Sequence, residues 1–263
     1  MTDDAGPGAI AYALIEARRG AVALAAFPGP PLQSLADAYA VQSKVLKGVG
    51  GKVLGWKVGR IPAVLVGPLA AERLAGPILS VEDAADPEAR VFPGGAGAVE
   101  AEFMLRLARI PTRLPDSNQE VSALIDEVRA GIEIASSPVR SIHDDAPFGI
   151  IADLGINNGN LLGPRFERDG DFAGLQVTTA IDGRVVGQGR ACNVLDGPFG
   201  SVLFVLKLHF EGMIELAAGQ WISAGAITGV HSIEPGQVAE FDFGGRAQMR
   251  CIAVAQRPTR CLA

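Results

Sequence analysis

The sequence contains no cluster of Lys and Arg residues that could follow the phosphates of a nucleic acid. Its 23 basic residues are outnumbered by 29 acidic ones, which gives a formal net charge of −6 and a pI near 5.2. Binding to nucleic acids depends on a concentrated positive potential. We therefore expect no nucleic-acid partner.

Cysteine is scarce as well. The three cysteines, Cys192, Cys251 and Cys261, are odd in number and no CxxC pair occurs. This pattern argues against a disulfide framework and against a structural zinc site. We expect reduced thiols, with Cys192 and Cys251 packed as small apolar side chains.

Long hydrophobic runs are also missing. The chain starts with the acidic stretch MTDDAG, which leads into no apolar signal core, and runs such as SVLFVLKLHF are too short to span a bilayer. These features predict a cytoplasmic protein that makes no membrane contact.

The chain does have ample material for a core. It has 263 residues, of which 48% are hydrophobic, and its 33 glycines and 17 prolines are scattered between apolar stretches. Such a distribution is typical of many short strands and turns rather than of a flexible linker.

Apolar spacing and capping residues predict both helices and strands. Helices are expected at residues 8–19, 34–48, 68–76, 117–130 and 198–212. Strands are expected at residues 51–59, 99–108, 131–137, 175–189 with a hairpin turn at Asp182-Gly183, 220–230, 237–245 and 247–255. This order predicts an α+β fold built around a curved mixed sheet.

Two short strands carry an unusual set of acidic residues. In VEAEF, residues 99–103, Glu100 and Glu102 are two positions apart, so their side chains lie on one face about 7 Å from each other. Glu133 lies in the same way in GIEIASS, between two isoleucines. The pattern leaves two interpretations open: the solvated face of amphipathic strands, or an oxygen-rich site for a hard divalent cation.

Several stretches, taken in order, resemble the 2-keto-4-pentenoate hydratase group of the fumarylacetoacetate hydrolase superfamily. They are SLADAYAVQ at 34–42, GWKVG at 55–59, VEAEF at 99–103, GIEIASS at 131–137, IADLGINNGNLLG at 151–163 and NVLDGPFGSVLFVLKLHFEGMIELAAGQWISAGAITG at 193–229. The resemblance implies a fumarylacetoacetate-hydrolase-like mixed β-roll with an N-terminal helical segment and peripheral helices. It places the helical segment and cap at residues 1–80 and the β-roll catalytic domain at residues 81–263, within one integrated unit.

The resemblance also implies a function. Glu100, Glu102 and Glu133 match the family's ligands to Mg²⁺ or Mn²⁺, and Lys57 matches a lysine near the substrate. The implied activity is a hydro-lyase that adds water to a 2-hydroxydienoate or 2-oxo-4-enoate through a metal-chelated enolate, giving a 4-hydroxy-2-oxo acid. Lys57 or a metal-bound water would carry the proton. The expected partners are a small 2-oxo acid, further copies of this chain, and an aldolase or decarboxylase of the same pathway.

Two other functions stay open, because the metal ligands alone do not separate them. One is a decarboxylase for a 2-oxo-3-enedioate of the 4-oxalocrotonate type, and the other is a divergent binding protein for 2-oxo acids without turnover. Hydrolysis of a diketone is less expected, because it resembles sites with an early histidine, whereas His143, His209 and His231 all come late. We expect His209 in the core and regard His143 and His231 as candidates for the rim of the site.

The segments that should face the substrate depart from the family pattern. Where a Leu-Thr-Ser-like segment is usual, the chain has Arg60, Ile61 and Pro62, and Arg60 is a candidate to bind a second substrate carboxylate. An acidic residue usual in the family is absent at Leu74, Ala75 and Gly76.

Two further departures concern candidate site residues. At residues 152–157 the family usually has an Ala-Asp-Asn-Ala-Ser-Ser pattern, and of its polar residues this chain keeps only Asp153. Asp153 is either a catalytic residue or a turn residue. The late Thr-Gly-Ser-like segment reads Ala224, Gly225 and Ala226, and Thr228 is either a substrate contact or a sheet hydroxyl.

Overall fold

The computed structural model describes residues 6–83, 87–168 and 170–259. The helices are α1 (Pro7–Gly20), α2 (Leu35–Val49), α3 (Ala63–Leu69), α4 (Asn118–Ser122), α5 (Phe148–Ala152) and α6 (Gly197–Phe210), with 3₁₀ turns η1 (Ile142–Asp145), η2 (Leu154–Ile156) and η3 (Ala191–Asn193). The strands are β1 (Gly55–Arg60), β2 (Arg73–Ile78), β3 (Val81–Glu82), β4 (Glu88–Val91), β5 (Ala96–Leu107), β6 (Ile125–Ser137), β7 (Asn157–Phe166), β8 (Gln176–Ile181), β9 (Arg184–Arg190), β10 (Trp221–Ser223), β11 (His231–Ser232), β12 (Val238–Phe243) and β13 (Gln248–Ala255).

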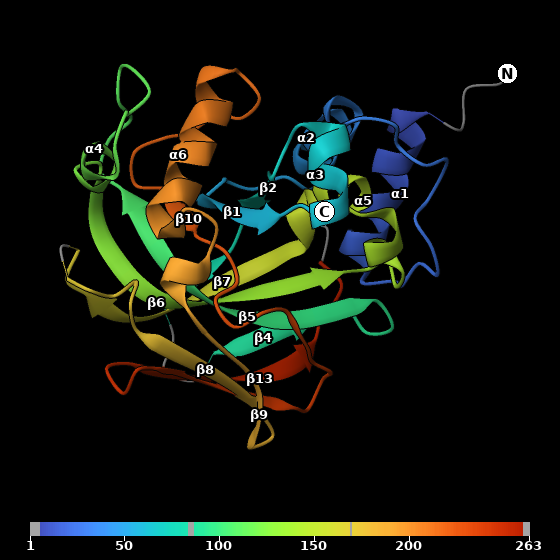
Figure 1. Cartoon of the computed structure of the whole chain (residues 1–263). Helices are drawn as coiled ribbons and strands as arrows, with labels where there is room; N and C mark the ends of the chain where they lie inside the picture. Colours follow the sequence, from blue (N-terminus) through green and yellow to red (C-terminus); the bar gives the residue numbers. More distant parts are fainter. Residues whose placement is uncertain (1–5, 84–86, 169, 260–263) are drawn as a thin grey trace, which may run out of the picture.

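The strands form two sheets that face each other (Figure 1). The larger sheet has the order β2-β1-β10-β5-β6-β7-β3, with β11 also paired to β5, and the smaller sheet has the order β4-β13-β12-β8-β9. Strands β5, β6 and β7 are antiparallel neighbours, whereas β1 and β10 are parallel. The expectation of an α+β fold with a curved mixed sheet is confirmed.

The core between the two sheets is centred on one aromatic ring. Phe103 of β5 is fully buried and meets Phe166, Phe172 and Phe243 edge to face, with ring centroids 5.2, 4.9 and 5.5 Å away. Edge-to-face pairs of this kind add to the free energy that burial of the rings contributes. Side chains alternate along a strand, so the polar residues of β5 lie on the face opposite this apolar core.

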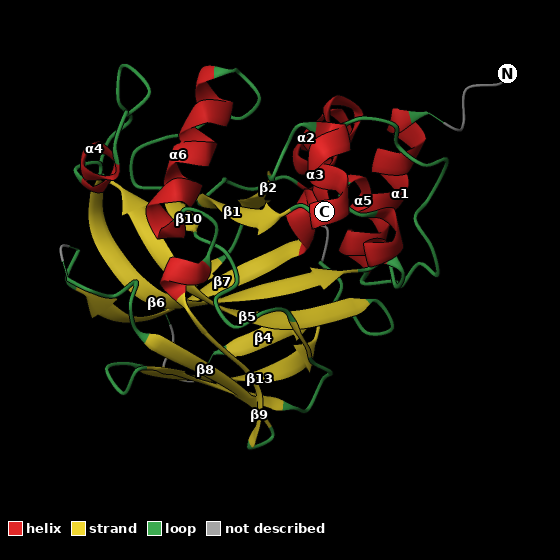
Figure 2. Cartoon of the chain, viewed as in Figure 1, coloured by secondary structure: helices red, strands yellow, loops and turns green. Residues whose placement is uncertain are grey.

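The helices lie along one side of the molecule (Figure 2). The N-terminal helices α1 and α2 pack on each other, and α2 also packs on α5. Apolar side chains of α1 and α2 share a cluster with Ala98 of β5 and Ala135 of β6. Strands β1 and β2, which fall within the expected N-terminal segment, belong to the larger sheet. In the described part of the chain no helix is long and apolar enough to cross a membrane.

Several predicted elements are confirmed. Helix α1 ends in Arg18 and Arg19, and Ser34 caps α2 by accepting a hydrogen bond from the Asp37 backbone N–H. The Asp182-Gly183 turn joins β8 to β9, with both residues in the left-handed region. Helix α2 continues past Gly48 to Val49, so the expected end at Gly48 is one residue early.

The helix predicted at residues 117–130 is wrong beyond its first turn. Ser117 does cap α4, but α4 ends at Ser122, and residues 125–137 form β6. Ile125 and Val128 are fully or almost fully buried when β6 pairs with β5. Pairing along a long neighbouring strand therefore overrides the helical spacing of this segment.

The helix predicted at residues 68–76 is also wrong. Helix α3 ends at Leu69, Ala70 adopts a left-handed conformation, and residues 73–78 pair with β1 as strand β2. Similarly, the strand expected at residues 220–230 is limited to Trp221–Ser223, after which the chain leaves the sheet until β11.

The cysteine expectations are met in part. Cys251 is buried, as predicted, but Cys192 is exposed at the surface, so its expected apolar packing is wrong. Both are free thiols. Cys261 lies outside the described residues.

The Phe103 cluster provides a test of the core. Replacing Phe103 with Ala removes a ring with no exposed surface, and we expect the free energy of unfolding to fall by about 3–5 kcal/mol in urea titrations. Phe210→Ala, at a ring that is 45% exposed, is the matched control and should cost less than about 1 kcal/mol. Equal losses in the two variants would contradict the placement of Phe103.

Candidate metal centre

Three glutamates meet on the face of the larger sheet that points away from the smaller sheet. Glu100 of β5 lies directly opposite Glu133 of β6, and Glu102 lies two residues further along β5. Their exposed fractions are 5% for Glu100 and 0% for both Glu102 and Glu133. One carboxylate oxygen of each lies within 4.8 Å of the other two. The interpretation as a solvated strand face is therefore wrong.

The local sequence explains this convergence. Phe103 on β5, and Ile132 on the paired strand β6, face the apolar core. Alternation along each strand then turns Glu100, Glu102 and Glu133 to the opposite face. Like charges opposite each other on paired strands are destabilising, and burial increases that cost.

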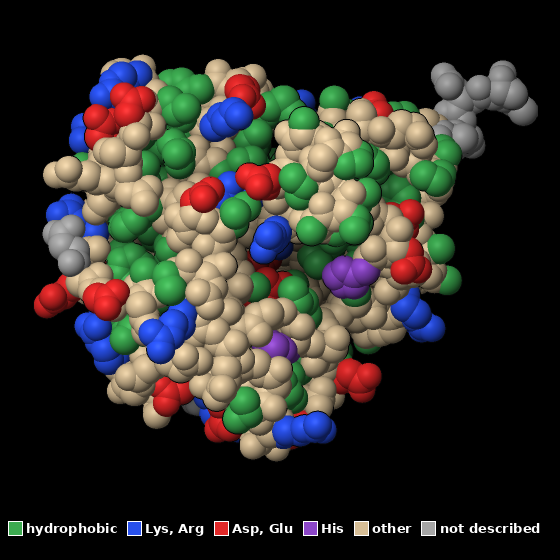
Figure 3. Space-filling model, viewed as in Figure 1, with side chains coloured by type: hydrophobic (Ala, Val, Ile, Leu, Met, Phe, Trp, Pro, Cys, Tyr) green, Lys and Arg blue, Asp and Glu red, His purple; other side chains and the backbone are tan. Residues whose placement is uncertain are grey.

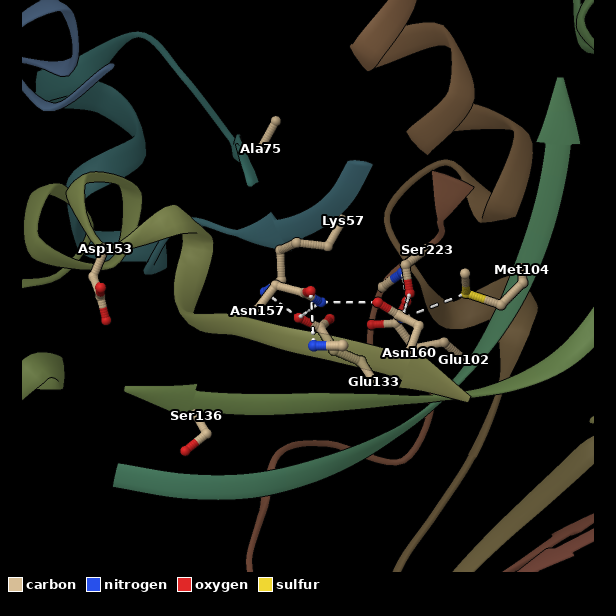
Figure 4. A network of polar contacts seen from close by, with 12 residues as sticks. Lys57, Ala75, Glu102, Met104, Glu133, Ser136, Asp153, Asn157, Asn160 and Ser223 are labelled. Carbon is tan, nitrogen blue, oxygen red and sulfur yellow. Dashed lines mark hydrogen bonds and ion pairs between the residues drawn. The ribbon is translucent and has the colours of Figure 1, made fainter. Parts of the chain in front are cut away.

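Hydrogen bonds from distant segments hold the carboxylates in place (Figure 4). One oxygen of Glu102 accepts from the Ser223 hydroxyl and, at 3.0 Å, from the Gly225 backbone N–H. One oxygen of Glu133 accepts from Asn157 Nδ2 at 3.1 Å and lies 3.2 Å from Lys57 Nζ. Each of these two glutamates is thus oriented through one of its two oxygens.

The second oxygens are left without a partner. Glu102 Oε1 and Glu133 Oε2 are buried and make no hydrogen bond with any described residue. An unpaired buried carboxylate oxygen is costly, and such atoms in a native fold are explained by an ion, a ligand or a catalytic role. The three carboxylates, with these free oxygens, fit a hard divalent cation that prefers oxygen ligands.

The electrostatics of the cluster are strongly perturbed. Burial, followed by the charge of Glu133, raises the pKa of Glu100 to about 8, against the opposing effect of Lys57. Burial and the charges of Glu133 and Glu100 raise the pKa of Glu102 well above its usual value. Burial alone would lower the pKa of Lys57, but the three carboxylates outweigh it and raise that pKa. Two carboxyls as hard to ionise as those of Glu100 and Glu102 are typical of a functional site.

One member of the cluster, Glu100, lines a cavity of about 440 Å³. Lys57 and Glu100 reach the cavity, and the space-filling view shows a hollow near the centre of this face, bordered by basic and histidine side chains (Figure 3). Most of the lining is apolar; the polar and charged members are Lys57, Arg60, Arg73, Glu100, His143, Asn193 and Ser201. A larger hollow of about 830 Å³, beside β12 and β13, is lined by none of the three glutamates. The smaller cavity is the one suited to a small ligand that contacts the cluster.

The structure brings some of the predicted site residues together and keeps others apart. Lys57 and Arg60 of β1 line the cavity with Glu100. Neither Asp153 nor Thr228 is among the described residues that line it. The Thr228 hydroxyl instead lies 2.7 Å from the Thr179 hydroxyl of the smaller sheet and 3.1 Å from His231 Nε2. Thr228 therefore joins the two sheets, as a sheet hydroxyl would.

Asp153 is held by an ion pair away from the cluster, as its position in Figure 4 shows. Its Oδ1 accepts from Arg18 Nε at 2.5 Å, and its backbone carbonyl accepts from the same guanidinium at 3.0 Å. With exposed fractions of 8% and 0%, Arg18 and Asp153 form a buried link between α1 and the loop after α5. Asp153 Oδ2 is buried and makes no hydrogen bond with any described residue, but Asp153 does not line the cavity, so its catalytic role stays a prediction.

The loop that follows Asp153 has a strained backbone. Leu154, Gly155 and Ile156 are all left-handed, with φ values of 57°, 66° and 55°. Left-handed conformations are unfavourable for branched side chains and cost roughly 1–3 kcal/mol each. A Cβ on Gly155 would lie 2.8 Å from Gly76 Cα and 3.2 Å from Lys57 Cδ, so only glycine allows this loop to pack against the lysine.

The histidines take three different positions. His143 lines the cavity, in agreement with its candidacy for the site rim. His209 is half-buried on α6 and not in the core as expected, but its Nδ1 contacts the backbone of Ile214 and Leu216, so it is a satisfied structural group. His231 binds Thr228 at the junction of the sheets.

Three polar residues of the centre were not predicted from the sequence. Asn157 donates to Glu133 and, at 2.9 Å, to Asn160, which in turn donates to the Ser223 hydroxyl at 2.9 Å. Asn157 lies in the segment 152–157, which departs from the family pattern. That departure was the only feature of the sequence that pointed to Asn157. Nothing in the local sequence marks Asn160 or Ser223.

Sequence comparisons find no relatives: no family model matches the chain, and no curated protein matches it. Solved structures do match. The fold resembles 4-oxalocrotonate decarboxylase from Pseudomonas putida G7, complexed with calcium and acetate, with a TM-score of 0.77 and 23% identity, covering 94% of this chain and 97% of that one. A second structure of that enzyme, complexed with magnesium and adipate, also has a TM-score of 0.77, with 22% identity over the same shares of the two chains.

More distant structures have the same fold. A putative fumarylacetoacetate hydrolase family protein from Yersinia pestis CO92 has a TM-score of 0.57 at 14% identity, covering 76% of this chain and 93% of that one. Fumarylpyruvate hydrolase from Pseudomonas aeruginosa, in complex with Mn²⁺ and pyruvate, has a TM-score of 0.55 at 13% identity, covering 76% and 89%. The chain therefore has the fumarylacetoacetate-hydrolase-like fold.

The raised pKa of Glu100 predicts a pH dependence of the metal-free protein. Between the usual pKa of 4.5 and the folded value of about 8, the folded chain keeps a proton that the unfolded chain releases. The contribution of Glu100 to the free energy of unfolding is therefore fully present below pH 4.5 and is lost as the pH rises through 8. We expect urea unfolding in EDTA to show about 3.5 kcal/mol less stability at pH 8 than at pH 5.

Glu100→Gln is the matched control, because it keeps the shape of the side chain and cannot ionise. The difference in unfolding free energy between the variant and the original chain should grow as pH rises. A difference that stays constant from pH 5 to pH 8 would contradict the predicted shift.

Proposed function

We propose that this protein is a divalent-cation-dependent lyase of the fumarylacetoacetate hydrolase superfamily that acts on a small 2-oxo acid. The observation that carries the proposal is the buried trio Glu100, Glu102 and Glu133, with two unpartnered oxygens, beside a cavity lined by Lys57. The fold similarity to a decarboxylase and a hydrolase supports the class of enzyme.

Mg²⁺ or Mn²⁺ is the proposed cofactor. Three ionised carboxylates carry three negative charges, which a divalent cation and the Lys57 ammonium together would neutralise. Solved proteins with this fold hold calcium, magnesium or Mn²⁺. The absence of Cys and His from the trio favours a hard cation over zinc.

The cation would supply Lewis-acid chemistry by binding the carboxylate and 2-oxygen of the substrate and stabilising negative charge on that oxygen. Lys57 holds a proton at Nζ beside Glu133 and lines the cavity, so it can carry a proton to or from the substrate. Asn157 and Ser223 orient Glu133 and Glu102, and the apolar walls of the cavity exclude water around the reacting group.

The first candidate reaction is hydration of a 2-hydroxydienoate or 2-oxo-4-enoate to a 4-hydroxy-2-oxo acid, which the sequence resemblance supports. The second is decarboxylation of a 2-oxo-3-enedioate, supported by the similarity to 4-oxalocrotonate decarboxylase over 94% of this chain. Both reactions develop charge on the 2-oxygen of the substrate, so the same trio and the same lysine serve either one.

A metal titration tests the cation site. We expect saturating Mg²⁺ or Mn²⁺ to raise the melting temperature by several degrees, because a ligand that binds only the folded state stabilises it. Glu102→Gln and Glu133→Gln should abolish this rise, whereas Glu215→Gln, at an exposed glutamate outside the trio, should keep it. A cation-induced rise that persists in both trio variants would rule out the site.

A paired assay separates the reactions. With a 2-hydroxydienoate, loss of the dienol absorbance without release of carbon dioxide would identify a hydratase. With a 2-oxo-3-enedioate, release of carbon dioxide would identify a decarboxylase. Lys57→Met should lower kcat at least a hundredfold in whichever reaction occurs. If the protein binds 2-oxo acids with Mg²⁺ and turns over neither substrate, it is a binding protein and the lyase proposal fails.

A further inference from the structure

The cavity carries one positive charge that nothing in the described structure neutralises. Arg60 ends β1, has an exposed side chain that lines the cavity, and forms no hydrogen bond or ion pair with any described residue. The other cations of the lining are engaged: Lys57 with Glu133, and Arg73 with Asp196 at 2.7 Å. Arg60 is therefore the side chain of this wall that is free to bind an anion.

Arg60 faces a second positive charge across the strand pair. Arg60 and Arg73 are directly opposite each other on the antiparallel strands β1 and β2, where like charges repel. Asp196 and the Leu195 carbonyl, both 2.7 Å from Arg73, offset the charge of Arg73 alone. An anion bound at Arg60 would remove the remaining imbalance.

The backbone beneath Arg60 is well fixed. Ile61, the next residue, is fully buried, and its N–H donates to the Glu72 carbonyl at 2.9 Å. A guanidinium on such an anchor offers two parallel N–H donors, which match a carboxylate better than the single ammonium of a lysine does.

The spacing between Arg60 and Lys57 along β1 limits the length of a ligand that both could contact. Arg60 is three residues beyond Lys57 on the same strand, so about 10 Å separates their Cα atoms. Apolar side chains, among them Val58, Leu74 and Val194, line the cavity with them. The arrangement suits a short ligand with an oxygen-rich end at the trio, an apolar middle and a second anionic end.

We infer that Arg60 binds a second carboxylate at the far end of the 2-oxo acid, which makes the cavity selective for dicarboxylic over monocarboxylic 2-oxo acids. The inference rests on the proposed function, since that function places the 2-oxo end at the trio. It deepens that function by giving the substrate class, a dicarboxylic 2-oxo acid. The residue that would recognise this class, Arg60, is one at which the chain departs from the family pattern.

Binding of two non-reacting probes tests the inference. 2-Oxoadipate and 2-oxohexanoate have the same length and the same 2-oxo acid end, and differ in ending with a carboxylate or a methyl group. In calorimetric titrations with saturating Mg²⁺, we expect 2-oxoadipate to bind at least tenfold more tightly, as a charge-assisted hydrogen-bonded pair implies. Arg60→Gln should bring this ratio close to one, and Arg60→Lys should leave an intermediate ratio.

Arg184→Gln is the matched control, because Arg184 is exposed on β9 and is not among the residues that line the cavity. It removes the same charge and should keep the full preference. A ratio close to one in the original chain, or a ratio that Arg60→Gln leaves unchanged, would overturn the inference.

The proposed function and the role of Arg60 would fail in different ways. If 2-oxohexanoate binds only with Mg²⁺ and 2-oxoadipate binds equally well, the proposed function stands and the role of Arg60 is wrong. If neither probe binds in a Mg²⁺-dependent way, the proposed function fails and the inference fails with it.

Discussion

The structure depends on the burial of three carboxylates on two paired strands. Glu100, Glu102 and Glu133 have almost no exposed surface, and their oxygens lie within 4.8 Å of one another. Such an arrangement opposes folding, because each charge is desolvated and repels its neighbours. A cation, a lysine or retained protons must compensate for it, and the fold brings Lys57 of β1 to within 3.2 Å of Glu133. A site that a fold maintains at such a cost is more readily explained by function than by stability.

The rest of the fold holds this cluster in place. Phe103 anchors β5 against Phe166 of β7 and Phe243 of β12, and the pairing of β5 with β6 places Glu100 opposite Glu133. The buried pair of Arg18 and Asp153 ties the N-terminal helix to the strained loop after α5, and that loop leads directly to Asn157, which orients Glu133. The helices that flank the larger sheet thus contribute to the centre without placing side chains on the carboxylates.

The likeness to solved structures concerns the fold. The fold matches a decarboxylase over 94% of this chain, although only 23% of the aligned residues are identical. Within that framework the trio can serve any reaction that develops charge on the oxygen of a 2-oxo acid. Residues such as Arg60, on the wall and not in the cluster, would then decide which acid is accepted. The centre would define the type of chemistry, and the cavity wall would define the substrate.

Sequence alone determined the features that depend on local periodicity. Alternation placed Glu100 and Glu102 on one face, Ser34 and Ser117 marked helix starts, and the Asp182-Gly183 hairpin was readable from two residues. Tertiary structure decided the rest. Residues 125–130 have the spacing of a helix but pair with β5 as a strand, because burial against a neighbour outweighs local preference. The partner of Asp153 is 135 residues away and that of Thr228 is 49 residues away, so no local pattern could show that one forms a buried ion pair and the other joins two sheets. Whether the glutamates were solvated or buried was decided in the same way, since burial depends on what the folded chain places above the strand.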